Sequence, residues 1–211
     1  DEREIGIGSN NIKAVYVDEQ KSLVYIGTHA GGLTVLHRNS GQMESFNQLN
    51  SQLVNENVYA ILPDKEGSIL LGTLSALVSF NPEKRSFTTI DKEKDGTPFT
   101  SQRITILFRD SRKRLWIGGE EGISVFQQEG IEIEKAPILP ESSVTKMFTN
   151  CIYEAANGII WVGTREGFYC FNEKEKKIKR YTTANGLPNN VVYGILEDTF
   201  GRLWVSTNRG I

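Results

Sequence analysis

The sequence predicts an all-β protein, a β-propeller made of four-stranded antiparallel blades. One observation is a repeated motif of the form Trp-(Ile/Val)-Gly-Thr, whose glycine position recurs at Gly27, Gly72, Gly118, Gly163 and, as a serine, Ser206. The steps are 45, 46, 45 and 43 residues, a period typical of arrays of small structural units. The other observation is that short β-prone runs alternate with turn residues, while no apolar helical period extends over three turns.

The second copy shows how one unit divides into strands. An apolar run, NVYAILPD, is followed by the turn 64–67, with Asp and Gly at positions that favour them. SILLGT is a short strand, the loop 74–76 leads to ALVSF, and RSFTTI follows the turn 81–84. Four strands in about 45 residues cannot bury both faces of their sheet alone, but blades packed face to face around an axis can.

The copies define the organisation of the chain. We expect one partial β-propeller over residues 1–211, with about four and a half blades, as a fragment of a larger propeller. The approximate blades are 10–50, 55–95, 101–140, 146–185 and 189–211, the last incomplete. A closed ring of five blades is the alternative, in which residues 4–8 supply an outer strand to the last blade.

Alignment of the copies assigns the three tryptophans to one structural position. Trp116, Trp161 and Trp204 all stand at the start of the second strand, where the other copies have Tyr25 and Leu70. A large apolar ring there would lie between neighbouring sheets. We therefore expect these residues to be structural.

The two cysteines fall on the same blade. With strands named A to D from the axis outward, Cys151 lies on strand A and Cys170 on strand C. Two strand spacings separate them by about 9–10 Å, whereas a disulfide needs about 4.4–6.8 Å. We predict two buried free thiols and no metal site of the usual cysteine spacing.

Composition excludes several classes of function. The formal net charge is −2, with 38% hydrophobic and 24% charged residues, so we expect a globular chain that binds no nucleic acid. No apolar run approaches the roughly 20 residues of a membrane span, and the first residues do not resemble a signal peptide. The basic segment 172–180 is interpreted as protection of an exposed sheet edge, with a polyanion-binding patch as the alternative.

Binding residues are expected where the copies differ, because the repeated positions form the framework. B–C and D–A loops should emerge on one face, around the channel mouth. Amides, arginines and carboxylates there can hydrogen-bond sugar hydroxyls, and arginine can pair with the carboxylate of an acidic sugar. The candidate ligand-binding residues are His29, Glu120, Arg103, Arg165, Asn189, Asn190, Asn208 and Arg209. The alternative is that these loops are polar only because water surrounds them.

No motif indicates catalysis. The sequence has no serine nucleophile elbow, metal-ligand cluster or phosphate-binding loop. Glu120 with Glu121, or Glu166 near Arg165, suggests paired carboxylates, but adjacent residues on a strand point in opposite directions. We therefore expect no catalytic residue, no metal ligand and no cofactor.

The consensus Asp-x-x-Gly-x-(Leu/Ile)-Trp-(Ile/Val)-Gly-Thr-x-x-Gly-(Leu/Ile/Phe)-x-x-Phe resembles the two-component regulator propeller repeat. Residues 184–207 match it best, and weaker forms cover nearly the whole chain. The resemblance implies the periplasmic sensor region of a hybrid two-component system histidine kinase of Bacteroidetes. Such a region would bind an oligosaccharide, form a homodimer, and signal to a kinase through membrane and kinase segments that this chain does not contain.

Two other functions are compatible with the same residues. A protein–protein interaction propeller would use the loop residues to dock a partner, and a glycan-active propeller enzyme would use them to act on a sugar. The repeat pattern alone does not separate these alternatives from a sensor.

Overall fold

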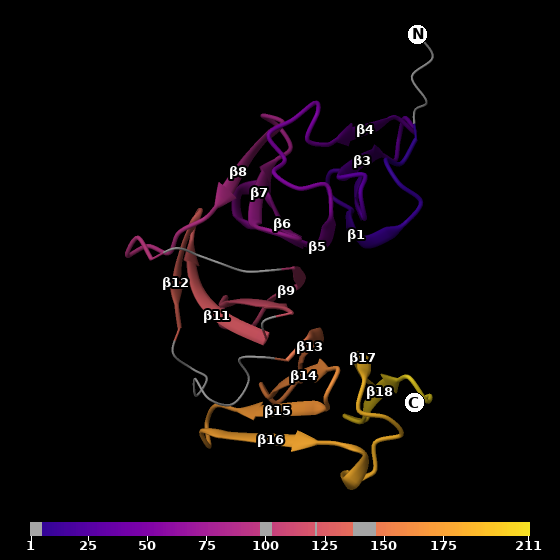
Figure 1. Cartoon of the computed structure of the whole chain (residues 1–211), viewed down its shortest axis with the longest axis vertical. Coiled ribbons are helices and arrows are strands. Elements are labelled where there is room, and N and C mark those ends of the chain that lie inside the picture. The colour runs from indigo at the N-terminus through magenta and orange to yellow at the C-terminus, as the bar shows by residue number, and fades with distance from the viewer. Residues whose placement is uncertain (1–5, 98–102, 121, 137–146) are drawn as a thin grey trace. The chain divides into compact units, whose positions relative to one another are not determined.

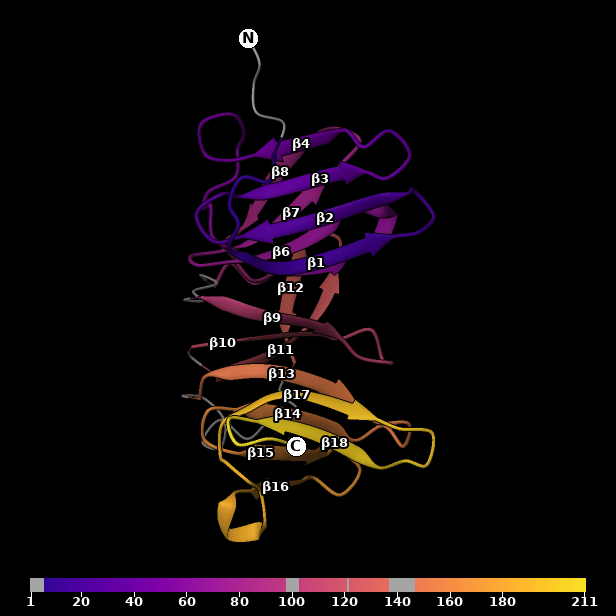
Figure 2. The ribbon, with the colours of Figure 1, turned by 90° about the vertical axis from the view of Figure 1, so that its right-hand side faces the viewer.

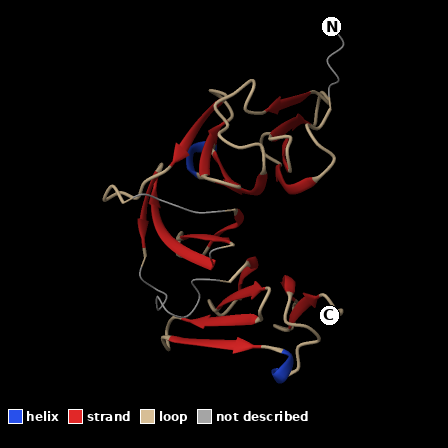
Figure 3. Cartoon of the chain, viewed as in Figure 1, coloured by secondary structure: helices blue, strands red, loops and turns tan. Residues whose placement is uncertain are grey.

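The computed structural model describes residues 6–97, 103–120, 122–136 and 147–211. These residues form strands β1 to β18 and two short 3-10 helices, so the predicted all-β propeller class is confirmed (Figures 1 and 3). Of the predicted third blade, residues 101, 102, 121 and 137–140 lie outside the described residues. The chain divides into two compact units, residues 1–107 with 129–133, and residues 108–128 with 134–211.

The first unit contains two complete blades, each an antiparallel sheet whose strands follow one another in chain order. Figure 2 shows the first of these sheets with its strands side by side. Its strands are β1 (Ile12–Asp18), β2 (Leu23–Thr28), β3 (Leu33–His37) and β4 (Met43–Phe46). The second sheet consists of β5 (Val58–Pro63), β6 (Ile69–Thr73), β7 (Leu77–Asn81) and β8 (Ser86–Ile90), with the helix η1 (Lys65–Gly67) in its first turn.

The third sheet contributes residues to both units, and the remaining sheets belong to the second unit. The third sheet consists of β9 (Ile104–Arg109), β10 (Leu115–Gly119), β11 (Gly122–Glu129) and β12 (Glu132–Lys135). The fourth consists of β13 (Thr149–Glu154), β14 (Ile160–Thr164), β15 (Phe168–Asn172) and β16 (Lys177–Tyr181). The helix η2 (Thr183–Asn185) then leads to a two-stranded sheet of β17 (Val192–Glu197) and β18 (Leu203–Thr207).

Aromatic side chains fill the space between successive sheets in each unit. In the first unit, Phe80 stacks on Phe87 with ring centroids 4.5 Å apart, and Phe46 lies 5.1 Å from Phe80. In the second unit, Trp116 meets Phe171 edge-on at 6.3 Å. Burial of such rings supplies much of the hydrophobic stabilisation of a fold with small blades.

The tryptophan position differs in burial from blade to blade. Trp116 is only 1% exposed and packs between sheets as expected, whereas Trp161 is half-buried and stacks on Phe168 at 4.8 Å. Trp204 is 48% exposed, because no described sheet follows the sheet that carries it. The packing expectation therefore holds for Trp116, whereas Trp204 has no described sheet against it and is held by the hydrogen bond from its indole to Asp198.

The glycine of the repeat makes room for the next blade. A Cβ atom on Gly27 would lie 2.8 Å from a methyl carbon of Val58, and one on Gly72 would lie 2.6 Å from a methyl carbon of Ile104. Both partners begin the innermost strand of the following blade and are fully buried. Glycine is thus required by close packing at these two positions, since a side chain would displace the neighbouring strand.

The aspartate before the first turn organises a side-chain network in the third blade. The Asp110 carboxylate accepts hydrogen bonds from Arg114 Nε at 2.6 Å and from Trp116 Nε1 at 2.8 Å. It also accepts the backbone N–H groups of Arg112 at 3.0 Å and Arg114 at 2.9 Å. The Asp110 side chain is fully buried, and Arg114 also pairs with Glu173 at 3.0 Å.

The same network recurs in the last sheet, where it is more exposed. Asp198 accepts bonds from Arg202 Nε at 2.7 Å and Trp204 Nε1 at 3.0 Å. Burial raises the pKa of the Asp198 carboxyl, but these bonds and the N–H groups of Arg202 and Phe200 outweigh it and lower the pKa to about 2. The pattern Asp-x-x-x-Arg-x-Trp therefore encodes a capped turn tied to strand B.

Both cysteines are free thiols on β13 and β15, with β14 between them. They are partly rather than fully buried, which differs from the expectation. Burial raises the pKa of Cys151 to about 12, and it raises the pKa of the more accessible Cys170 as well.

Residues 6–8 lie along the first blade of the first unit. The Gly6 carbonyl accepts a hydrogen bond from the Ser45 hydroxyl, and the Gly8 N–H donates to the Thr34 hydroxyl.

Candidate functional site

A repeated hydrogen bond joins the B–C loop of a blade to the start of strand A in the same blade. In each of four blades, the first B–C loop residue donates its backbone N–H to the carbonyl of the residue before strand A. The pairs are His29 with Asn11, Leu74 with Asn57, Arg165 with Phe148, and Asn208 with Val191. We call this side of each blade, with its B–C loop and the start of its strand A, the loop face. The bond holds the variable loops against the innermost strand.

A bulge places an extra side chain on the loop face. In the second blade, the pairing of β5 with β6 jumps from Val58 to Ala60, which leaves Tyr59 without a cross-strand partner residue. Similar irregularities occur at Lys13, Asn150 and Tyr193 in the corresponding strands. Bulges of this kind re-aim a side chain and are frequent beside binding sites.

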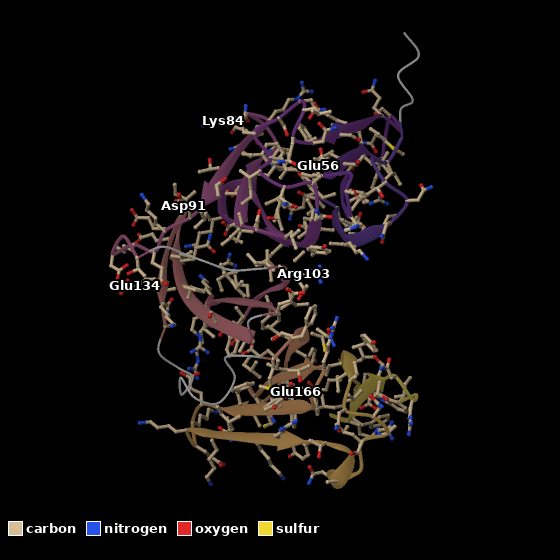
Figure 4. The ribbon with its side chains drawn as sticks, viewed as in Figure 1. Glu56, Lys84, Asp91, Arg103, Glu134 and Glu166 are labelled. Carbon is tan, nitrogen blue, oxygen red and sulfur yellow. The ribbon has the colours of Figure 1, made fainter. Side chains whose placement is uncertain are left out.

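Tyr59 forms a cluster with two of the predicted residues in the first unit. His29 Nδ1 lies 3.4 Å from the Tyr59 hydroxyl, and the two ring centroids are 6.3 Å apart. The guanidinium carbon of Arg103, which is labelled in Figure 4, lies 5.6 Å from the centre of the Tyr59 ring. We call these three residues the Tyr59 cluster. It combines an aromatic face, an imidazole and a permanent positive charge.

The backbone beneath this cluster is held in an unusual conformation. Arg103 has φ of 45° and Ala30 has φ of 59°, a region that residues other than glycine rarely adopt. The Arg103 N–H donates to the Leu74 carbonyl at 2.8 Å, and the Ala30 N–H donates to the Asn57 side chain at 3.1 Å. Neighbouring blades thus fix both loops, and strained loop residues of this kind are concentrated at functional sites.

The second unit brings a different pair together. The Arg165 guanidinium carbon lies 3.8 Å from the centre of the Phe148 ring, a close cation–π contact. Asn150 donates its side-chain amide to the Val192 carbonyl at 2.8 Å and so joins two blades. Tyr193, the bulge residue of the last sheet, is 55% exposed.

The other predicted residues divide into exposed and structural ones. Glu120, Asn208 and Arg209 are exposed at the ends of B strands, and Glu121 lies outside the described residues. The Asn189 side chain accepts the Val191 N–H at 2.9 Å, and the Asn190 side chain accepts the Thr183 N–H at 2.7 Å. These bonds favour a turn-stabilising role for both asparagines.

Glu166, which the sequence places near Arg165, contacts Arg180 instead. Arg180 donates to the backbone carbonyl of Glu166 and lies 3.9 Å from its carboxylate. Figure 4 labels Glu166. Among the residues that the structure describes, no group of three or more acidic, histidine or cysteine side chains is arranged to hold a metal ion.

Tyr59 is the residue that sequence reasoning missed. The corresponding residues in the other copies are Lys13, Thr105, Asn150 and Tyr193. This position varies as much as the loops do, although it lies in a strand. Variation inside an otherwise regular strand was the available signal for it.

Two cavities lie on the opposite side of the blades, which carries the A–B and C–D turns. One, of about 290 Å³, belongs to the first unit and is lined in part by Asp64 and Lys84. The other, of about 270 Å³, belongs to the second unit and is lined in part by Arg112 and Glu173. The arginines of the second cavity already pair with Glu173, at 2.6 Å for Arg112.

Comparison with known proteins agrees with the repeat. The model of the family "Two component regulator propeller" matches residues 142–166 and 186–209. Histidine kinase P4 of Formosa agariphila is 28% identical over 98% of this chain, which covers 16% of that protein. The repeats of this chain therefore resemble two-component regulator propeller repeats.

Solved structures share the fold. The extracellular domain of a Bacteroides thetaiotaomicron protein attributed to a hybrid two-component system superposes with a TM-score of 0.74 and 24% identity, over 94% of this chain and 27% of that chain. A second extracellular domain from the same organism, attributed to a one-component system, superposes with a TM-score of 0.78 and 21% identity. The superposition covers 96% of this chain and 27% of that chain. At these identities the likeness shows the β-propeller fold, and this chain spans about a quarter of either structure. None of the helices in the described residues is long and apolar enough to cross a membrane.

Proposed function

We propose that this chain is a ligand-recognition segment in the sensor region of a hybrid two-component system. Its ligand is an oligosaccharide, its compartment is the periplasm, and the kinase that it regulates lies outside this chain. The repeat match, the histidine kinase relative and the extracellular propellers of similar fold support this proposal. The chain itself performs no catalysis.

The Tyr59 cluster is the observation that carries a binding role. A half-buried tyrosine ring can pack against the apolar face of a sugar, as aromatic side chains do in many ligand sites. Arg103 and His29 flank the ring with hydrogen-bond donors, and the arginine can pair with a carboxylate on an acidic sugar. Strand hydrogen bonds and buried neighbours hold the ring and the two loops in place, which reduces the entropy cost of binding.

A thermal-shift screen of the chain against neutral and acidic oligosaccharides tests this function, with product analysis in the same tubes. We expect at least one oligosaccharide to raise the melting temperature with no product formed. A product would support the glycan-active enzyme instead. No response to any oligosaccharide would contradict the sensor proposal and favour the protein-interaction propeller.

Variants locate the binding. Removing a hydrogen bond to a charged group costs about 1.5–3 kcal/mol, which corresponds to roughly a ten- to hundredfold loss of affinity. We expect this loss for Arg103→Gln and for Tyr59→Ala. Arg38→Gln is the matched control, since Arg38 is an exposed arginine at the turn side that pairs with Glu19. Equal affinity in all three variants would place the ligand elsewhere.

A further inference from the structure

The cavity of about 290 Å³ in the first unit is lined mainly by hydroxyl and amine groups. It lies against the sheet of the second blade, between the A–B turn, the C–D turn and the turn that joins β11 to β12. Its lining includes Asp64, Lys65, Ser79, Lys84, Ser86 and Thr88. Every one of these residues belongs to the second blade.

The sheet surface of this cavity departs from the repeat. Ser79 pairs with Leu70 across strands B and C, and the corresponding residues in three other blades are Val35, Val125 and Cys170. A hydroxyl therefore stands in the second blade where other copies present apolar or weakly polar side chains. Departures from the framework mark positions that the fold itself does not require.

Three hydroxyls gather on this surface. Ser79 stands directly opposite Thr88 in the pairing of β7 with β8, and Ser86 precedes Thr88 by two residues on the same face. Opposite residues in such a pair have Cβ atoms about 4.5–5.5 Å apart. None of these three hydroxyls hydrogen-bonds another group of the described chain, so all three can bind a ligand.

Two ammonium groups stand at the rim of the cavity. Lys65 lies in the A–B turn and Lys84, labelled in Figure 4, lies in the C–D turn. Both are exposed, and neither forms an ion pair within the described part of the chain. Asp64 adds one carboxylate, which can accept hydrogen bonds from ligand hydroxyls and would repel a ligand that carries several negative charges.

We propose that this cavity binds a small hydroxylated carboxylate, of the size and chemistry of a single sugar acid. The serine and threonine hydroxyls pair with ligand hydroxyls, and the lysine ammonium groups pair with the carboxylate. Ile131, which is 54% exposed at the cavity edge, packs against the carbon skeleton. The volume lies at the lower limit of ordinary ligand pockets, which favours one ring over an oligosaccharide.

Isothermal titration of the chain with glucuronate, galacturonate, glucose, galactose and inorganic sulfate tests this site. We expect a dissociation constant on the order of 1 mM for at least one of the two uronates. The matched neutral sugar should bind at least about tenfold more weakly, since it loses the charge-assisted bond. Sulfate binding equal to that of the uronates, or no uronate binding at tens of millimolar, would overturn the proposal.

Variants confine the binding to this cavity. Ser79→Val introduces the residue that two other blades carry at this position, so we expect the fold to be kept and the uronate affinity to fall about tenfold or more. Thr88→Val, on the same sheet surface, should also lower the uronate affinity. Lys84→Gln should abolish the preference for the uronate over its neutral sugar, whereas Lys177→Gln, an exposed lysine in the other unit, should not. Unchanged affinity in the first three variants would refute the assignment. Loss of uronate affinity in Tyr59→Ala with unchanged affinity in Ser79→Val would place the uronate at the loop face and overturn the proposal.

Discussion

Replacing Asp110 by alanine should destabilise the protein by about 3 kcal/mol. The Asp110 carboxylate is fully buried and accepts the Arg114 side chain, the Trp116 indole and two backbone N–H groups. The substitution leaves these donors in an apolar environment, where each unsatisfied group costs roughly 1–3 kcal/mol. Breaking a buried ion pair costs about 3–5 kcal/mol. We expect a loss at the lower end of this range, because Arg114 keeps Glu173 as an ion-pair partner at 3.0 Å.

Urea denaturation followed by far-UV circular dichroism measures this loss. With a slope of about 2 kcal/mol per molar urea, a loss of 3 kcal/mol lowers the midpoint by roughly 1.5 M. Asp198→Ala is the matched comparison, since it removes the same acceptor in a network whose arginine is 65% exposed; water replaces part of the lost bonds there, so we expect a smaller loss of stability. A midpoint shift for Asp110→Ala below about 0.5 M, or no larger than that for Asp198→Ala, would refute the reasoning.

Three further predictions concern pH, thiol reactivity and packing. The pKa of Asp198 is about 2 in the folded chain and about 3.9 when unfolded, so its stabilising effect is present above about pH 4 and is lost as the pH falls toward 2. The difference in urea midpoint between wild type and Asp198→Asn should therefore shrink over that window, and a constant difference would contradict it. Burial raises the pKa of Cys151 to about 12, so Ellman's reagent at pH 8 should modify Cys170 before Cys151 in the native chain. After denaturation without reductant, the same reagent should titrate two thiols, and fewer than two would indicate a disulfide. Gly72→Val should lower the free energy of unfolding by about 1–3 kcal/mol, because the Cβ atom of the valine would lie 2.6 Å from a methyl carbon of Ile104. Thermal unfolding measures this loss, and an unchanged melting temperature would show that the contact is not close.

Local sequence patterns predict the strands of this fold well. In the second copy, the runs NVYAILPD and SILLGT correspond to β5 (Val58–Pro63) and β6 (Ile69–Thr73), and RSFTTI corresponds to β8 (Ser86–Ile90). Turn residues separate these runs, and turn chemistry is a local property of a few residues. The repeat then supplies the arrangement, since identical units can bury their faces only against one another.

Features that depend on contacts between strands are not predictable in this way. The bulge at Tyr59 arises from a jump in strand register between Val58 and Ala60, which no single strand sequence specifies. The Asp110 network depends on which side chains reach the buried carboxylate, which the spacing of the repeat motif does not specify. The exposure of Trp204 depends on which sheet, if any, lies against it, so one repeated position has different environments.

The candidate site was predictable in part for the same reason. His29 and Arg103 could be selected as variable loop residues of the first and third blades, but their meeting at Tyr59 needs the geometry of the second blade as well. Asn190 could be selected on the same grounds, yet its side chain accepts the Thr183 N–H in a turn. Amide side chains serve turns and ligands equally well, so residue type alone does not distinguish the two roles.

Hydrogen–deuterium exchange of the chain, with and without the oligosaccharide that gives the largest thermal shift, tests the central claim most directly. The proposal predicts slower exchange of backbone amides in the B–C loops after β2, β6, β14 or β18 and in the neighbouring strand A around Tyr59 or Tyr193. Peptides from the A–B and C–D turns should exchange as in the free protein. Protection confined to those turns, or to no part of the loop face, would contradict ligand recognition by the loop face.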